Sequence, residues 1–266
     1  MRETGMKKIL RLLQEGWFAF RFFKNFPVYY FERFGFLPKK QVTLLSRGGI
    51  HFRIQTHTTD IRVVNEIWNL SIYDPLLRFV KPNATVIDIG ANIGAFSIRA
   101  AKYAAHVNVI SYEPFPDNYK LLRENVRLNG IADQIITHNA AVAGHKGEIK
   151  FYSQEGDTGG GSIYPHGSPQ AMATMSVSAV TLEDVFRDNK VDFCEFLKID
   201  CEGAEVEILT AAPPSLWQKI QSMTIEWHED VASMNKKSFV ALIQGHGFKV
   251  QEAQDDRTIY AWREEK

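Results

Sequence analysis

The sequence predicts an α/β fold in which a mostly parallel sheet carries helices on both faces. Three observations lead to this fold class. From residue 85 onward, apolar runs alternate with amphipathic stretches that have the period of a helix. The run at 85–89 is continuously apolar, apart from one acid, as in strands buried on both faces. Two closing runs, at 248–253 and 258–262, are expected to pair antiparallel at the edge of the sheet.

The remaining elements are expected in regular order along the chain. Apolar and β-branched runs predict strands over 85–89, 107–112, 135–142, 147–152, 193–199 and 220–227. Helices are expected over 95–105, 116–129, 181–186, 204–211 and 236–245. Gly130 fits the cap that ends the second of these helices. The segment 153–175, with GDTGGGS at its centre, has the composition of a loop.

The first 59 residues form an extension ahead of the main domain, which we place at 60–266. A helix is expected over 6–24, and a β-hairpin over 42–54 around two adjacent glycines. Residues 1–40 hold nine Lys or Arg against three Glu, together with many aromatic residues. Two interpretations stay open: residues 6–36 contact a membrane surface, or the extension packs on the main domain or forms a homodimer contact.

The overall composition excludes several classes of protein. Basic and acidic residues balance at 31 each, which argues against a dedicated nucleic-acid partner. The aromatic stretch at 16–31 is interrupted by charges and a proline, so it should not span a bilayer. The two cysteines lack the spacing of a zinc site or a disulfide framework. We therefore expect a cytoplasmic protein, with peripheral contact to a membrane surface as an open alternative.

The turn after the first strand has the features of a cofactor loop. It reads Gly90-Ala91-Asn92-Ile93-Gly94, and its glycines let the backbone approach a ligand closely. Ligands of open α/β sheets bind at this end of the strands. The middle glycine of the dinucleotide fingerprint is replaced by Asn92, and Asp88 precedes the turn. An aspartate favours a sulfonium or ammonium neighbour over a pyrophosphate.

The end of the second strand points to an adenosine cofactor. Glu113 follows the glycine loop by about 20 residues, the spacing at which an acid accepts hydrogen bonds from a ribose. A ribose with free hydroxyls beside a positive charge indicates S-adenosylmethionine. An NAD-binding oxidoreductase is the alternative among enzymes, and Asn92 counts against it.

Several motifs in order resemble the FkbM family of S-adenosylmethionine-dependent methyltransferases. These motifs are VIDIGANIG, YEPFPDNYKLLRENVRLNG, NAAVAG, FLKIDCEGAEVEIL and TIEWHE, and they extend over roughly residues 60–262. The resemblance implies a class I methyltransferase (Rossmann-like) fold, with seven strands of which the last is antiparallel. It also implies methyl transfer to oxygen, commonly to a hydroxyl of a saccharide, a glycan or a secondary metabolite.

The same resemblance assigns cofactor-binding roles to residues at the strand ends. The methionine part is expected at Asp88, Gly90, Asn92 and Gly94. The ribose is expected at Glu113, which is followed by Pro114, and the adenine beside Asn139, Ala140 and Ala141. Asp200 and Glu202 would face the transferred methyl group.

The chemistry also needs a base that removes the proton of the acceptor hydroxyl. We predict His228 as this catalytic base, because its ordinary pKa is near neutral, with Asp200 orienting the substrate or the cofactor. Glu226 and Glu229 flank His228 and could raise its pKa or orient its ring. The acids Asp200, Glu202 and Glu226 could bind Mg²⁺, but nothing in their spacing requires a metal, and we expect none. A non-catalytic module that recruits partners through the N-terminal helix is the alternative outside enzymes.

Overall fold

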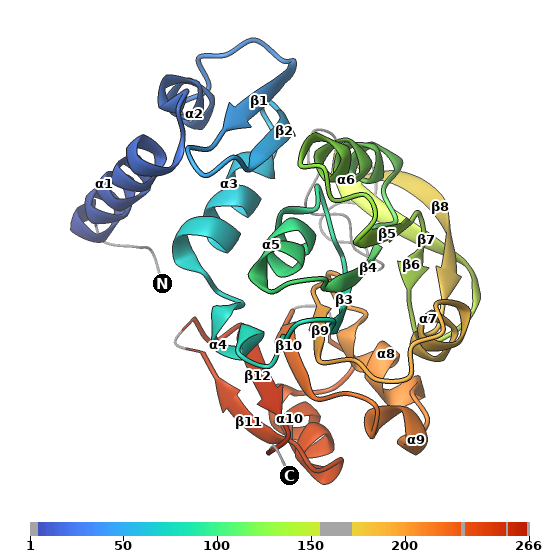
Figure 1. Ribbon diagram of the computed structural model, residues 1–266. Helices are drawn as coiled ribbons and strands as arrows, with labels where there is room; N and C mark the ends of the chain where they lie inside the picture. Colours follow the sequence, from blue (N-terminus) through green and yellow to red (C-terminus); the bar gives the residue numbers. More distant parts are fainter. Residues whose placement is uncertain (1–4, 155–171, 230–231, 254, 265–266) are drawn as a thin grey trace.

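A seven-stranded sheet forms the centre of the computed structural model, which describes residues 5–154, 172–229, 232–253 and 255–264. The strand order is β11-β12-β10-β9-β3-β4-β5 (Figure 1). The strands are β3 (Thr85–Ile89), β4 (Asn108–Tyr112), β5 (Ile135–His138), β9 (Phe196–Ile199), β10 (Ser222–Glu226), β11 (Lys249–Glu252) and β12 (Thr258–Trp262). Five of them run parallel, whereas β12 pairs antiparallel with both β10 and β11. This topology confirms the predicted fold class.

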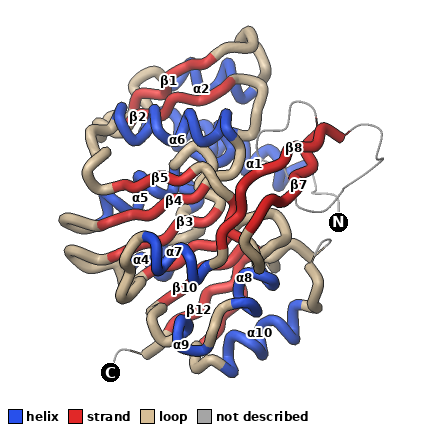
Figure 2. The backbone as a smooth tube through the Cα atoms, turned by 90° about the vertical axis from the view of Figure 1, so that its right-hand side faces the viewer, coloured by secondary structure: helices blue, strands red, loops and turns tan. Residues whose placement is uncertain are grey.

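Helices cover both faces of the sheet, which explains the continuously apolar strands (Figure 2). Val86 of β3 points into a core shared with α5 (Ala95–Tyr103) and α6 (Pro116–Leu128). Its neighbour Ile87 points into a second core, built with α7 (Leu182–Asp188), α8 (Glu205–Ala211) and α10 (Lys236–Gly245). Successive side chains of a strand thus enter opposite cores, as the pleat requires. The short α9 (Pro214–Trp217) joins the second core through Trp217.

A small second sheet corrects two of the sequence predictions. The strand expected over 135–142 divides into β5 and β6 (Ala141–Val142), because β6 leaves β4 and pairs with β8 (Met172–Val180) instead. The loop expected over 153–175 is also shorter, since β7 (Gly147–Gln154) pairs antiparallel with β8 along its whole length. The GDTGGGS stretch lies outside the described residues.

The N-terminal extension packs on the main domain. It comprises α1 (Gly5–Phe22), α2 (Phe26–Arg33) and the hairpin of β1 (Gln41–Leu45) and β2 (His51–Gln55). Phe23, Leu44 and Phe52 belong to the same core as Phe96 of α5. The helix expected over 6–24 ends at Phe22, and a new helix begins just before Pro27, because proline cannot continue the preceding turn. Among the described helices, none combines the length and apolarity needed to cross a bilayer.

Two asparagines of α6 attach the hairpin to the domain. The Asn125 side chain accepts a hydrogen bond from the Arg53 backbone at 2.6 Å and donates one back at 3.0 Å. Asn129 makes the same pair of bonds with the His51 backbone, at 2.9 and 2.7 Å. Backbone groups on the free edge of β2 therefore form hydrogen bonds with side chains rather than with another strand.

The segment after the hairpin forms α3 (Asp60–Asn65), the π-helical turn η1 (Glu66–Leu70) and α4 (Asp74–Leu77). The domain boundary at residue 59 stays a prediction.

Candidate active site

A cavity of about 280 Å³ lies at the carboxyl ends of the central strands. Seven residues predicted from the sequence to hold the cofactor line it: Gly90, Asn92, Glu113, Pro114, Ala140, Ala141 and Asp200. Glu202, expected to face the methyl group, lines the cavity as well. The end of the extension and the α3–η1 segment form another part of the wall, through Thr59, Arg62, Val63 and Glu66. The carboxyl ends of parallel strands are thus where the site lies, as expected for an open α/β sheet.

Gly90 brings the glycine loop directly against the end of β9. Its φ is +77°, and a Cβ at this position would lie 1.7 Å from the carbonyl oxygen of Asp200. The Gly90 and Ala91 amides both donate to the carbonyl of Tyr112, at 3.0 and 2.9 Å. The loop is therefore held between β4 and β9, with no room for a side chain at residue 90.

Asn92 stands where the dinucleotide fingerprint has a glycine, and the structure explains why asparagine is tolerated. Its φ is +51°, in the left-handed region that asparagine adopts more readily than most residues. Its side-chain oxygen accepts a hydrogen bond from the Ile93 amide at 2.7 Å. Its own amide donates to Glu113 at 2.8 Å.

Glu113 connects the two loops that were expected to hold the cofactor. The carboxylate is buried and accepts hydrogen bonds from the amides of Asn92 and Phe115, at 2.8 and 2.9 Å. Burial raises the pKa of Glu113 to about 7, against the opposing effect of these hydrogen bonds. The Glu113 carboxylate is thus a hydrogen-bond acceptor in the wall of the cavity. Its contact with a ribose stays a prediction.

Asp88 does not line the cavity, which corrects the idea that its charge faces a sulfonium directly. It is fully buried, accepts a hydrogen bond from Ser97 at 2.6 Å, and lies 3.2 Å from the amine of Lys198. The same amine lies 3.2 Å from Asp200 and donates to the Gly90 carbonyl at 2.9 Å. Burial disfavours the charged amine, but the two carboxylates outweigh it and hold the pKa of Lys198 above its ordinary value. The charge of Asp88 is therefore compensated inside the protein.

Gly94 and Asn139 also support the wall from behind rather than line it. Gly94 has φ +85° at the start of α5, and a Cβ there would lie 2.5 Å from Leu122 of α6. The Asn139 amide group donates to the backbone carbonyls of Glu113 and Pro114, at 2.9 and 3.0 Å. These two predicted cofactor residues shape the backbone around the site.

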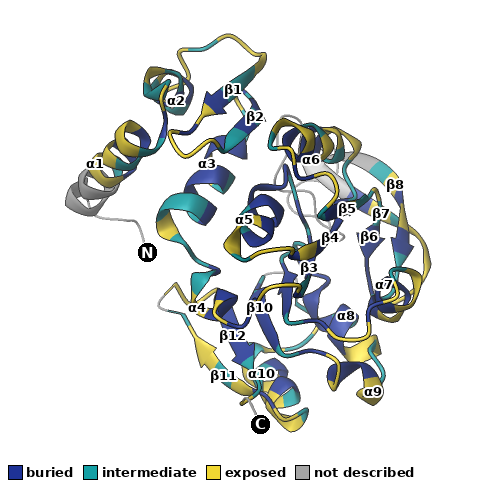
Figure 3. Cartoon of the chain, viewed as in Figure 1, coloured by how far each residue is buried: buried dark blue, intermediate teal, exposed yellow. Residues whose placement is uncertain are grey.

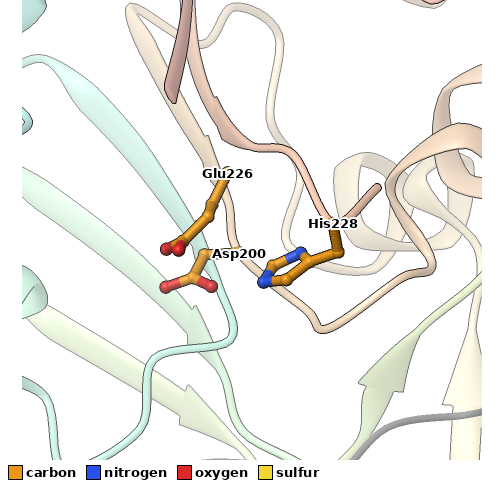
Figure 4. Close-up of side chains that lie close together, drawn as sticks. All are labelled: Asp200, Glu226 and His228. Atoms are coloured by element: carbon orange, nitrogen blue, oxygen red, sulfur yellow. The ribbon is translucent and has the colours of Figure 1, made fainter. Parts of the chain in front are cut away.

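Two carboxylates face each other at the acidic side of the cavity. Asp200 follows β9 and Glu226 ends β10, and ligand-type atoms of these residues and of His228 lie within 4.8 Å of one another (Figure 4). The charge of Asp200, followed by burial, raises the pKa of Glu226 to about 8. Burial opposes ionisation of Asp200, but Lys198 and His228 outweigh it and lower its pKa. Tyr73 donates a hydrogen bond to Asp200 at 3.3 Å.

His228, the predicted base, is enclosed by carboxylates. Its Nδ1 lies 2.7 Å from Glu205, a carboxylate almost fully buried, and its Nε2 lies 3.3 Å from Glu202. Burial alone would lower the pKa of His228, but the bond to Glu205 and the charges of its acidic neighbours raise it to about 10. The ring therefore keeps its proton at neutral pH, and it is not among the residues that line the cavity. The role of His228 as base stays a prediction, and this environment favours Glu226 for the task.

Glu205 and Glu226 contribute more contacts to the site than their positions in the sequence indicate. Glu226 is two residues before His228 on a strand end, so a period of two places both on one face, which is a usable signal. Glu205 has no such signal. Its carboxylate also accepts hydrogen bonds from the amides of Cys201 and Gly203, at 3.3 and 3.1 Å, and these contacts exist only in the folded turn.

Asp200, Glu226 and His228 together are a donor set that could hold a divalent cation. His228 would have to lose its proton to act as a ligand, and Lys198 already neutralises Asp200. We therefore expect the rate of methyl transfer to be unchanged after treatment with EDTA, measured with a labelled methyl donor. Loss of the rate on chelation, with recovery on adding Mg²⁺ or Mn²⁺, would establish a metal site here.

Comparison with known proteins decides the family. Residues 88–250 match the family described as the Methyltransferase FkbM domain. The chain belongs to the FkbM methyltransferase family. It is 25% identical over 203 residues to the 31-O-demethyl-FK506 methyltransferase FkbM of Streptomyces tacrolimicus, a match that covers 66% of this chain and 76% of the relative. It is 24% identical over 179 residues to the hexuronic acid methyltransferase AglP of Haloferax volcanii, covering 64% and 70% of the two chains.

Among solved structures, the methyltransferase FkbM from Methylobacillus flagellatus KT matches with a TM-score of 0.48 at 16% identity. This match covers 68% of the present chain but only 44% of the other. Membership of this methyltransferase family supports S-adenosylmethionine as the methyl donor. Two features of the cavity fit this donor: the backbone at Gly90 can approach a ligand without a side chain, and the buried carboxylate of Glu113 can accept hydrogen bonds from hydroxyls.

Proposed function

We propose that this methyltransferase transfers the methyl group of S-adenosylmethionine to a hydroxyl oxygen of a saccharide or a secondary metabolite. One observation carries the proposal: a single cavity is lined by the glycine loop and Glu113 and also by the pair Asp200 and Glu226. The first set suits the cofactor, and the second suits an acceptor that must lose a proton. The two sets share one enclosure, which would bring the reacting atoms together.

The work of the protein is to orient the acceptor and to take its proton. S-adenosylmethionine supplies a methyl group already activated by the positive charge on its sulfur. Orientation of the two reactants contributes the larger share of the rate, with effective molarities of about 10⁵ M or more in model reactions. A positioned base adds about 10²–10⁴-fold.

Glu226 is the better placed proton acceptor. It lines the cavity, and its raised pKa of about 8 brings it close to neutral pH, where a general base works best. Asp200 stays ionised beside Lys198. Its carboxylate can accept a hydrogen bond from the hydroxyl group that receives the methyl. The His228 ring holds Glu202 and Glu205 in place through its two nitrogens, which makes it a positioning residue in this mechanism.

The class of acceptor rests on the relatives and on the charge balance. The names of two relatives specify a 31-O-demethyl natural product and a hexuronic acid. The first name specifies methylation at an oxygen, and we extend an oxygen acceptor to the present chain. The balance of 31 basic and 31 acidic residues favours a small molecule or glycan over nucleic acid.

Calorimetric titration tests the cofactor part of the proposal. S-adenosylmethionine and its demethylated product are expected to bind with micromolar affinity, whereas NAD is not. Glu113→Ala should weaken both by tenfold or more, because a buried acceptor for the ribose is lost. The exposed Glu148→Ala serves as a matched control and should bind normally. Binding of NAD alone would overturn the assignment.

A second assay tests transfer to oxygen. The protein is incubated with deuterated S-adenosylmethionine and a panel of sugars and hydroxylated metabolites, and products are located by mass spectrometry. We expect label on an ether oxygen. Label on nitrogen or carbon would contradict O-methylation, and tight cofactor binding without transfer to any acceptor would support the non-catalytic module instead.

A further inference from the structure

The extension carries a continuous line of aromatic rings, of which Phe26 and Tyr30 are half-buried against the main core and the other four are exposed. Consecutive rings in this line lie 5.2–6.5 Å apart between centroids. We call it the aromatic strip, and it consists of Trp17, Phe20, Phe26, Tyr30, Phe34 and Phe36. It runs from α1 across α2 to the turn that follows. The rings form one surface and are not scattered singly.

Much of the aromatic strip is open to solvent. Trp17 is 62% exposed, Phe34 54% and Phe36 75%. The α1 and α2 helices stand at the edge of the molecule, and both carry exposed residues (Figure 3). The inner side of the same segment is already used, since Phe23 and Tyr29 are buried in the main core. Contiguous apolar surface of this kind marks a place where another body binds.

The charges around the aromatic strip indicate which kind of partner it fits. Among the side chains described from residue 12 to residue 40, every exposed charge is positive: Arg21, Lys24, Lys39 and Lys40. The two acids in this range, Glu15 and Glu32, are buried, and Glu15 pairs with Arg33 at 2.9 Å. The Arg21 guanidinium lies 5.8 Å from the centre of the Trp17 ring, so positive charge adjoins the strip itself.

We infer that the aromatic strip docks this protein on the surface of an anionic membrane. Aromatic rings bordered by Lys and Arg are the residues that enter the interface between lipid headgroups and acyl chains. Each basic side chain near an anionic surface strengthens the binding further. A second copy of the chain is the less favourable occupant, because two such surfaces would bring positive charges together. The inference goes beyond the proposed function and does not depend on it.

Vesicle flotation with the full chain tests the docking. Vesicles of phosphatidylcholine mixed with phosphatidylglycerol are expected to carry the protein upward, and vesicles of phosphatidylcholine alone are not. Binding should weaken as salt is raised, since the attraction is partly electrostatic. The double variant Trp17→Gln with Phe36→Gln should lower the partition coefficient about tenfold or more, because two exposed rings are lost.

Matched variants test whether weaker binding is specific to the aromatic strip or follows from any loss of exposed apolar surface or positive charge. Phe193→Gln removes an exposed ring elsewhere and should bind like the unaltered protein. Lys24→Glu should weaken binding about tenfold, whereas Lys237→Glu on α10 should not. Binding of S-adenosylmethionine, measured in every variant, shows that each one is folded.

Three results would overturn the inference. They are no flotation with anionic vesicles, equal flotation of the double variant, or equal effects of the Lys24 and Lys237 substitutions. A dimer seen by sedimentation without lipid, and lost in the double variant, would assign the aromatic strip to self-association. Methyl transfer could persist in all of these cases, so the docking and the proposed function fail separately.

Discussion

Replacing Gly90 with alanine is expected to destabilise the fold by about 2–5 kcal/mol and to abolish binding of S-adenosylmethionine. A Cβ at this position would lie 1.7 Å from the Asp200 carbonyl oxygen, and the φ of +77° adds strain for any L side chain. The atom it meets belongs to the backbone, so β3 and β9 would have to separate at their carboxyl ends. The free energy of unfolding in urea and a calorimetric titration of the cofactor measure the two effects.

Gly130→Ala is the matched control for this prediction. Gly130 also has a positive φ, +63°, but a Cβ there would meet nothing within 4 Å. It should therefore cost only the strain of the left-handed conformation, about 1–2 kcal/mol, and leave cofactor binding intact. Equal losses of stability and binding in both variants would show that the close approach of Gly90 to Asp200 is not what matters.

Glu226→Gln is expected to lower the rate of methyl transfer by about 10²–10⁴-fold while leaving the cofactor bound. The ionised carboxylate is the form that accepts a proton, so the rate of the unaltered protein should rise with pH. Its midpoint should lie near 8, the value to which Asp200 and burial raise the pKa of Glu226. The pH dependence of single-turnover transfer measures this directly.

Two further variants distinguish Glu226 from His228. Asp200→Asn removes the charge that contributes most to the raised pKa of Glu226, so the midpoint should move to lower pH, whatever happens to the rate. His228→Gln should reduce the rate and move the midpoint to higher pH, because the charge of His228 lowers the pKa of Glu226. A midpoint near 10 that disappears in His228→Gln and survives in Glu226→Gln would restore His228 as the base.

Much of the fold was predictable because its signals are local. Alternating strand and helix patterns need only neighbouring residues, and they identified the sheet and its antiparallel edge. The glycine loop, Glu113 and Asp200 follow strand ends, and parallel strands bring such ends to one edge. The two strand errors, at 135–142 and 153–175, occurred where β6 and β8 pair across about 40 residues of chain, beyond any local pattern.

The sequence by itself indicated the family, the fold class and the edge of the sheet where the cofactor is expected. Only the tertiary structure decided how charge is distributed there. Lys198 lies between Asp88 and Asp200, and the ring of His228 lies between Glu202 and Glu205. Each arrangement depends on burial and on contacts between separate strands and turns, and these shift the pKa of a group away from the ordinary value of its type. For that reason the sequence could name the candidates for catalysis, whereas their protonation states and partners had to come from the folded chain.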